Sequence, residues 1–124
     1  FLPSTVVKIL KSMRNEPRSA YSFFYSLKDR GFQHDVQCYL AIIEILSRRR
    51  LITKLDSLFI EILDVKNNDL SFEISELLGL LAKEGANGQF TVLLRAIDTL
   101  MKSYVSLGMF DEAVNTLFDT ERYG

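Results

Sequence analysis

The feature that most constrains this 124-residue sequence is a helix corner near its C-terminal end. An apolar helical run stops at Gly108, which can take the left-handed backbone conformation that closes a helix. Asp111 and Glu112 follow, and both suit the start of a new helix, where exposed N–H groups and the helix dipole favour acidic side chains. Ala113 is small enough for a close helix crossing. The segment therefore predicts a tight antiparallel helix pair.

The corner recurs along the chain, which predicts a repeat architecture. Leu55 follows Ala20 by 35 residues, and Ala113 follows Leu55 by 58. Phe24 and Phe59 share the 35-residue offset. A period near 35 residues with two helices per unit is typical of an α-solenoid. The longer second interval indicates an insertion of about 23 residues, 58 − 35, before the third unit.

Apolar residues at helical spacing predict an all-α fold, an α-solenoid of antiparallel helix-turn-helix hairpins with about seven helices and no strand. The first helix should open at Pro3 or Ser4 and break at Asn15. The others are expected over Pro17–Arg30, Val36–Arg49, Leu51–Val65, Ser71–Lys83, Gln89–Leu107 and Phe110–Arg122. A turn is expected at Asn67–Asp69 and a loop at Glu84–Gly88.

Composition favours a compact helical domain without catalytic machinery. With 48% hydrophobic and 25% charged residues, the chain can bury one elongated core, and no apolar run is long enough to span a membrane. The single cysteine, Cys38, excludes an internal disulfide and is expected as a buried thiol. His34 is the only histidine and is expected on a surface turn. No catalytic, metal-binding or phosphate-binding motif is visible, so neither an enzyme nor a cofactor is predicted.

Three segments resemble pentatricopeptide repeats. Residues 35–43, Asp-Val-Gln-Cys-Tyr-Leu-Ala-Ile-Ile, are similar to the usual opening Asp-Val-Val-Thr-Tyr-Asn-x-Leu-Ile. Residues 104–113 resemble the Gly-x-x-Asp-Glu-Ala corner, and residues 24–35 resemble the exit Phe-x-x-Met-x-x-x-Gly-x-x-Pro-Asp. The rival tetratricopeptide repeat usually carries Trp and Pro at its helix ends, whereas this chain has no Trp and two prolines. We therefore identify a resemblance to the plant-type, organellar P class, at the N-terminal end of a longer array.

The resemblance divides the chain into units of one repeat domain, 1–124. Residues 1–35 would form a degenerate first repeat, 36–66 a second, 67–89 an inserted helix and loop, and 90–124 an incomplete third. The inserted helix has one apolar face, made by Ile74, Leu77, Leu78 and Leu81. We expect this face to pack against the helix over Leu51–Val65 and the start of the helix over Gln89–Leu107. The insertion would change the step between repeats, so that RNA is not read continuously across it.

The family implies that each repeat contacts one RNA base through a first-helix side chain and the closing residue of the repeat. Carried over, the first-helix positions are Thr5, Leu40 and Asp98, and the closing positions are Asp35 and Leu70. Thr5 with Asp35 is a polar pair that in the family would imply a purine, and above all guanine. Leu40 with Leu70 offers no hydrogen bonds.

Charge is polarised along the chain. The first helices of the three units, which the family implies line the concave face, carry eight basic and two acidic residues, whereas the rest carries seven basic and fourteen acidic. We expect Arg48, Arg49, Arg95 and Lys102 to lie on one surface, largely free of carboxylate partners, and to contact the RNA backbone. The alternative for Arg48–Arg50 is a solvated helix end.

The resemblance implies an RNA-binding protein of an organelle, a mitochondrion or alternatively a chloroplast, that supports RNA processing, stability or translation. Its partner would be single-stranded RNA. The alternative is a structural subunit of a large ribonucleoprotein such as the mitochondrial ribosome, contacting ribosomal RNA and other ribonucleoprotein subunits. Neither reading needs a metal, a cofactor or a membrane.

Overall fold

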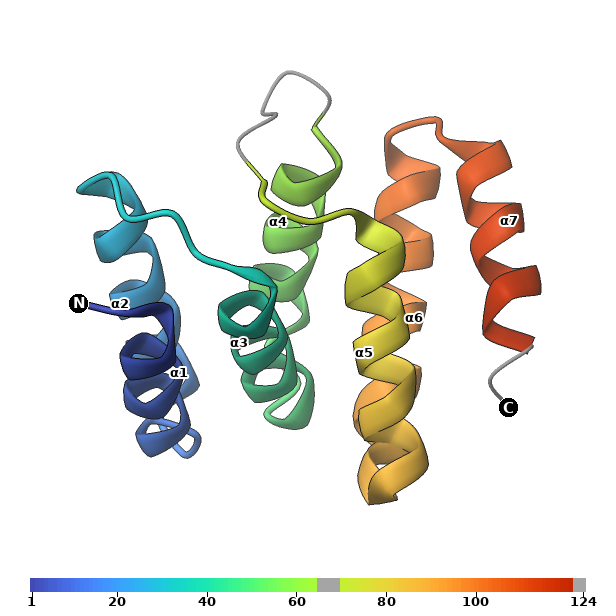
Figure 1. Ribbon diagram of the computed structural model, residues 1–124. Helices are drawn as coiled ribbons and strands as arrows, with labels where there is room; N and C mark the ends of the chain where they lie inside the picture. Colours follow the sequence, from blue (N-terminus) through green and yellow to red (C-terminus); the bar gives the residue numbers. More distant parts are fainter. Residues whose placement is uncertain (65–69, 122–124) are drawn as a thin grey trace.

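The computed structural model of the chain describes residues 1–64 and 70–121. Every element within these residues is a helix, which confirms the expected all-α fold (Figure 1). The helices are α1 (Pro3–Ser12), α2 (Pro17–Asp29), α3 (Val36–Arg48), α4 (Ile52–Leu63), α5 (Ile74–Glu84), α6 (Phe90–Ser106) and α7 (Phe110–Glu121), with a π-helical turn, η1 (Gly85–Gln89), between α5 and α6. The turn expected at Asn67–Asp69 lies outside the described residues. None of these helices is long and apolar enough to cross a membrane.

Helix starts follow the signals in the sequence. α1 and α2 begin with Pro3 and Pro17, whose fixed φ suits a first helical turn. Asp35 caps α3, because its Oδ1 accepts a hydrogen bond from the Cys38 N–H at 3.0 Å. The largest deviation is at α5, which begins at Ile74 and not at Ser71. Boundaries of this kind are set by local chemistry, which explains the close agreement elsewhere.

Three helices end with the same left-handed closing turn. Gly31 follows α2 with a φ of 92°, Gly108 follows α6 with 73°, and Arg50 closes α3 with 57°. After each, the next N–H donates to the carbonyl five residues earlier, as from Met109 to Tyr104 at 2.9 Å. The predicted corner at Gly108 is therefore confirmed. α3 closes in the same way with an arginine in the place of glycine.

Neighbouring hairpins stack side by side. α3 packs against α1 and α2, and α6 packs in the corresponding way against α3 and α4. Within hairpins, α3 and α4 are antiparallel neighbours, as are α6 and α7 (Figure 1). This arrangement is the helical-repeat fold that the sequence predicts. The exact division of the sequence into repeats stays a prediction.

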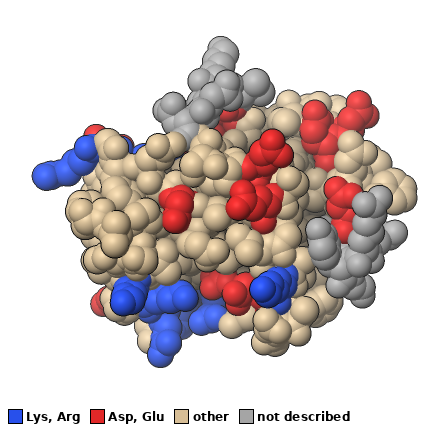
Figure 2. All heavy atoms as spheres, viewed as in Figure 1, with Lys and Arg blue, Asp and Glu red and all other residues tan. Residues whose placement is uncertain are grey.

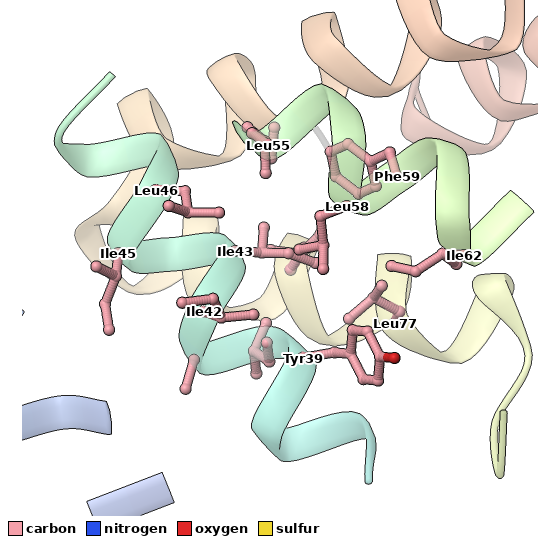
Figure 3. Packing of buried hydrophobic residues seen from close by; sticks show 14 of the residues in the cluster. Tyr39, Ile42, Ile43, Ile45, Leu46, Leu55, Leu58, Phe59, Ile62 and Leu77 are labelled. Atoms are coloured by element: carbon pink, nitrogen blue, oxygen red, sulfur yellow. The ribbon is translucent and has the colours of Figure 1, made fainter. Parts of the chain in front are cut away.

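The core is centred on α3, which is buried on most sides because five helices surround it. Its Ile43 lies beside Leu58 of α4, and Leu55 and Phe59 of α4 belong to the same cluster (Figure 3). Each fully buried side chain of this size contributes about 1.5–3 kcal/mol through removal from water. Ala20, Leu55 and Ala113, which were expected at close crossings, are all buried, with Ala113 8% exposed.

The inserted helix α5 has one of its two expected neighbours. It packs against α6, as expected, but its other main neighbour is α3 and not α4. Leu77 and Leu81 are buried, and Leu77 points toward the side chains of Tyr39 and Ile62 (Figure 3). The expectation placed α5 on the second helix of the unit, α4, whereas it lies against the first, α3. α5 therefore covers part of the surface of α3 that would otherwise stay open.

The expected loop at Glu84–Gly88 is also wrong. η1 continues from α5 and joins it to α6 through a kink at Asn87 and Gly88, where φ is 101° at the glycine. Gly85 is buried against α6, and a Cβ there would lie 2.5 Å from Leu93 Cδ2. Glycine permits this close approach, so the segment packs instead of extending as a loop.

His34 is buried and not on the surface, contrary to expectation. It is 3% exposed, its ring stacks on Phe24 with centroids 3.7 Å apart, and Nε2 lies 2.8 Å from the Phe24 carbonyl oxygen. Burial lowers the pKa of His34 below its usual value. Cys38 is buried as predicted, and burial raises its pKa to about 12. His34 thus packs the α2–α3 connection against α2, whereas Cys38 Sγ lies 3.7 Å from the Pro3 carbonyl oxygen at the start of α1.

Candidate nucleic-acid interface

The candidate site is an open groove between α1, α3 and the α5–η1 segment, with a volume of about 240 Å³. These three helices lie next to one another in the front layer of the molecule (Figure 1). The residues that line it are Lys11, Arg14, Ala41, Glu44, Ile45, Arg48, Glu84 and Gln89. We call this feature the α1–α3–α5 groove. It exists because the inserted helix forms a wall opposite α1.

The electrostatics of the groove are mixed. Lys11, Arg14 and Arg48 are exposed, whereas Glu44 and Glu84 are half-buried. Burial raises the pKa of Glu44, the nearby Glu84 carboxylate raises it further, and the charges of Lys11 and Arg48 oppose both effects. Cations therefore stand at the rim of the groove and two interacting carboxylates lie deeper.

Arg48 joins α3 to the inserted segment. Its Nη2 donates a hydrogen bond to Gln89 Oε1 at 2.9 Å. The other expected backbone-binding residues have structural partners as well. Arg95 Nη1 donates to the carbonyl oxygens of Ser47 at 3.2 Å and Arg48 at 3.3 Å, which places a cation at the negative C-terminal end of α3. Arg49 donates to Asn15 Oδ1.

Arg48, Arg49 and Arg95 thus meet around the end of α3, and none of them has a carboxylate partner within the described part of the chain. Lys102 differs, because its Nζ lies 3.1 Å from Asp98 Oδ2 in an exposed i,i+4 pair on α6. Lys102 is therefore the exception among the four cations, which were expected to be largely free of carboxylate partners. Whether these residues contact RNA stays a prediction.

The residues expected to face bases are dispersed. Thr5 is exposed in the first turn of α1, and Asp35 is half-buried, with one oxygen occupied as the cap of α3. Asp98 is exposed and paired with Lys102. Leu40 is 6% exposed, since α3 is enclosed by its neighbours, so its side chain cannot reach a base from this position. Leu70 is half-buried beside the α2–α3 connection.

Charged side chains are segregated on the face that carries α1, α3 and α5. Figure 2 shows Lys and Arg gathered mainly along its lower edge and Asp and Glu mainly over its middle and upper right. The α1–α2 and α3–α4 turns lie at that lower edge (Figure 1). Sequence reasoning missed Glu84 and Gln89 as site residues, because they belong to the insertion and have no place in the repeat pattern. The one sequence feature that pointed to them was their position beside the glycines of η1, where the chain kinks.

Comparison with known proteins finds two relatives in Arabidopsis thaliana. The chain is 36% identical over 116 residues, 93% of its length, to the mitochondrial pentatricopeptide repeat-containing protein At2g26790. It is 29% identical over 113 residues, 91% of its length, to the pentatricopeptide repeat-containing protein At1g13800. It spans 14% and 13% of the lengths of these two proteins. No protein-family model and no solved structure matches the chain. The likeness to the two relatives, together with the stacked hairpins, supports membership of the pentatricopeptide repeat family.

Proposed function

We propose that this chain is an RNA-binding segment of an organellar pentatricopeptide repeat protein of the plant P class. It would bind single-stranded RNA and support RNA processing, stability or translation by binding and not by catalysis. The family relationship supports RNA as the ligand. The mitochondrion is the proposed location, because the name of one relative includes it, with the chloroplast as the alternative. A fluorescent fusion of the full-length protein, imaged in plant cells, distinguishes the two organelles.

The observation that carries this proposal is the α1–α3–α5 groove with its cationic rim. Lys11, Arg14 and Arg48 are exposed and converge on one concavity from two helices. Cations around a concavity attract a phosphate backbone and release its counterions, which makes binding salt-dependent. A helix face on which each cation is paired with a carboxylate would not attract a phosphate backbone in this way.

The test is a pair of charge-matched variants of the purified protein. Lys11→Gln with Arg14→Gln removes two rim cations, whereas Arg18→Gln with Arg30→Gln removes two exposed cations outside the groove, one in α2 and one directly after its end. Fluorescence anisotropy with labelled single-stranded RNA over a series of salt concentrations measures affinity. We expect the rim variant to reduce the slope of log K against log salt by about 0.7 for each lost contact, and the control to leave it unchanged. Equal effects of both variants would contradict the assignment of the groove.

A second candidate function is that of a structural subunit of a large ribonucleoprotein such as the mitochondrial ribosome. The exposed apolar side chains of α7 favour it, since Phe110, Leu117 and Phe118 are 61%, 52% and 63% exposed. Such a face is suited to contact with another folded protein. Sedimentation of the tagged full-length protein from organelle lysate tests this candidate. Comigration with ribosomal subunits that survives nuclease treatment would favour it over binding to single-stranded RNA.

A further inference from the structure

Two carboxylates in the α1–α3–α5 groove have no partner. Neither Glu44 nor Glu84 makes a hydrogen bond or an ion pair with any residue that the structure describes. They come from different helices, α3 and α5, both line the groove, and the Glu84 carboxylate is close enough to raise the pKa of Glu44. Half-buried like-charged groups are unfavourable unless a donor lies between or against them. The packing of α5 against α3 nonetheless holds both at the same concavity.

The charges in the α1–α3–α5 groove indicate which kind of ligand it can bind. Phosphate would be repelled from the deeper carboxylates but attracted to the exposed Lys11, Arg14 and Arg48 at the rim. A divalent cation would meet the same three positive charges and has only two carboxylates to bind it. A neutral group rich in N–H donors that is covalently joined to phosphates matches both parts of this arrangement. A nucleotide with its base inward and its phosphates at the rim has this distribution.

We propose that the α1–α3–α5 groove holds one RNA base, preferentially guanine, whose N–H groups donate to Glu44 and Glu84 while the rim cations contact the adjacent phosphates. This proposal rests on the proposed RNA-binding function. It differs from the family pattern, because neither glutamate occupies a base-facing position carried over from the repeats. The groove, at about 240 Å³, lies below the range of about 300–1,000 Å³ for sites of drug-sized ligands, which suits a single base.

The order of preference follows from the edges of the bases. Guanine presents two adjacent donors, N1–H and the N2 amino group, which a carboxylate can accept together. Cytosine and adenine each offer one amino group, as in the acceptance of cytosine N4–H by acidic side chains. Uracil has a single N3–H between two carbonyl oxygens, which the carboxylates would repel. We therefore expect guanine to bind best and uracil worst.

The experiment uses short oligouridine strands with one central position changed to guanosine, inosine, adenosine, cytidine or uridine. Anisotropy titrations with the purified protein, in buffer with a chelator, measure the affinity of each. The guanosine strand should bind roughly five- to hundredfold more tightly than all-uridine RNA, the range of one good bidentate contact. Inosine, which lacks the N2 amino group, should lose most of that preference.

Variants assign the preference to the two glutamates. Glu44→Gln and Glu84→Gln keep side-chain size but replace a double acceptor by an amide, so each should reduce the guanosine preference at least severalfold. Glu76→Gln is the matched control, because Glu76 is an exposed carboxylate of α5 outside the groove. Its guanosine preference should equal that of the unmodified protein. Circular dichroism verifies that each variant is folded.

The outcomes separate this inference from the function on which it rests. Salt-dependent binding of every strand with equal affinity would overturn the guanine site and leave RNA binding intact. Absence of binding to any strand would overturn both. A preference that persists in both glutamate variants would place base recognition elsewhere. A preference that appears only with added magnesium would assign the carboxylates to a metal ion and contradict direct contact with the base.

Discussion

At the scale of single residues, Arg50 holds a backbone conformation that arginine rarely adopts. Its φ of 57° closes α3, and the Leu51 N–H donates to the Leu46 carbonyl at 3.0 Å across it. The left-handed conformation costs an L-residue about 1–2 kcal/mol relative to glycine, which has no Cβ to clash. Gly31 and Gly108 occupy the same closing position after α2 and α6. Arg50 is thus a strained residue at a helix-closing position that glycine occupies after α2 and α6.

We predict that Arg50→Gly stabilises the protein. The relief of strain exceeds the extra entropy of glycine in the unfolded chain, so the net gain should be about 0.5–1 kcal/mol. Urea denaturation measures the free energy of unfolding. Arg50→Ala is the control, since it removes the same charge but keeps the strain, and it should show no gain. Equal stabilisation by both variants would trace the effect to the arginine charge, and the strain argument would fail.

Residue-scale predictions from the sequence succeeded where local chemistry decides and failed where distant segments meet. The caps at Asp35 and Gly108 depend on a few adjacent residues and were predicted. The burial of His34 depends on Phe24 and Tyr39, which reach it only after α2 and α3 pack. Nothing in the turn around His34 indicates that contact, so a surface position was the natural expectation.

At the scale of elements, the join between α5 and α6 determines where the inserted helix lies. Gly85 is buried where the first turns of α6 approach, and Leu93 Cδ2 and Cβ lie 2.5 Å and 3.0 Å from the position of an added Cβ. The amphipathic pattern of α5 predicted a buried face because periodicity is a property of one segment. It did not predict α3 as the main neighbour, because that choice depends on the bend at η1.

We predict that Gly85→Ala destabilises the protein by about 1–3 kcal/mol through overpacking against Leu93. Chemical denaturation of the single variant measures this cost. Leu93→Ala in the same protein removes the clashing side chain, so the double variant should lose less stability than the sum of the single variants. Strict additivity of the two substitutions would show that the two residues do not meet, and the described join would be incorrect.

At the scale of the whole molecule, the inserted helix divides the face that RNA would follow. α5 stands against α3 and α6, so the surfaces of α1 and α3 open into the groove while α6 lies behind the inserted helix (Figure 1). Leu40, the family's base-facing position on α3, is buried among the helices that surround α3. The repeat spacing alone predicted that an insertion interrupts the array. Only the packing shows that the insertion also supplies Glu84 and Gln89 to the α1–α3–α5 groove.

The last prediction tests whether bound RNA extends past α5 onto α6. Arg48 lines the groove, whereas Lys102 lies on α6 in an exposed pair with Asp98. If the RNA path ends at α5, Arg48→Gln should reduce the slope of log K against log salt by about 0.7, as for one lost phosphate contact. Lys102→Gln, which makes the same change of charge, should leave both slope and affinity unchanged. Anisotropy titrations with single-stranded RNA over a range of salt concentrations compare the two. A comparable loss of slope in both variants would mean that RNA continues along α6, and the inserted helix would then not be a boundary of the binding path.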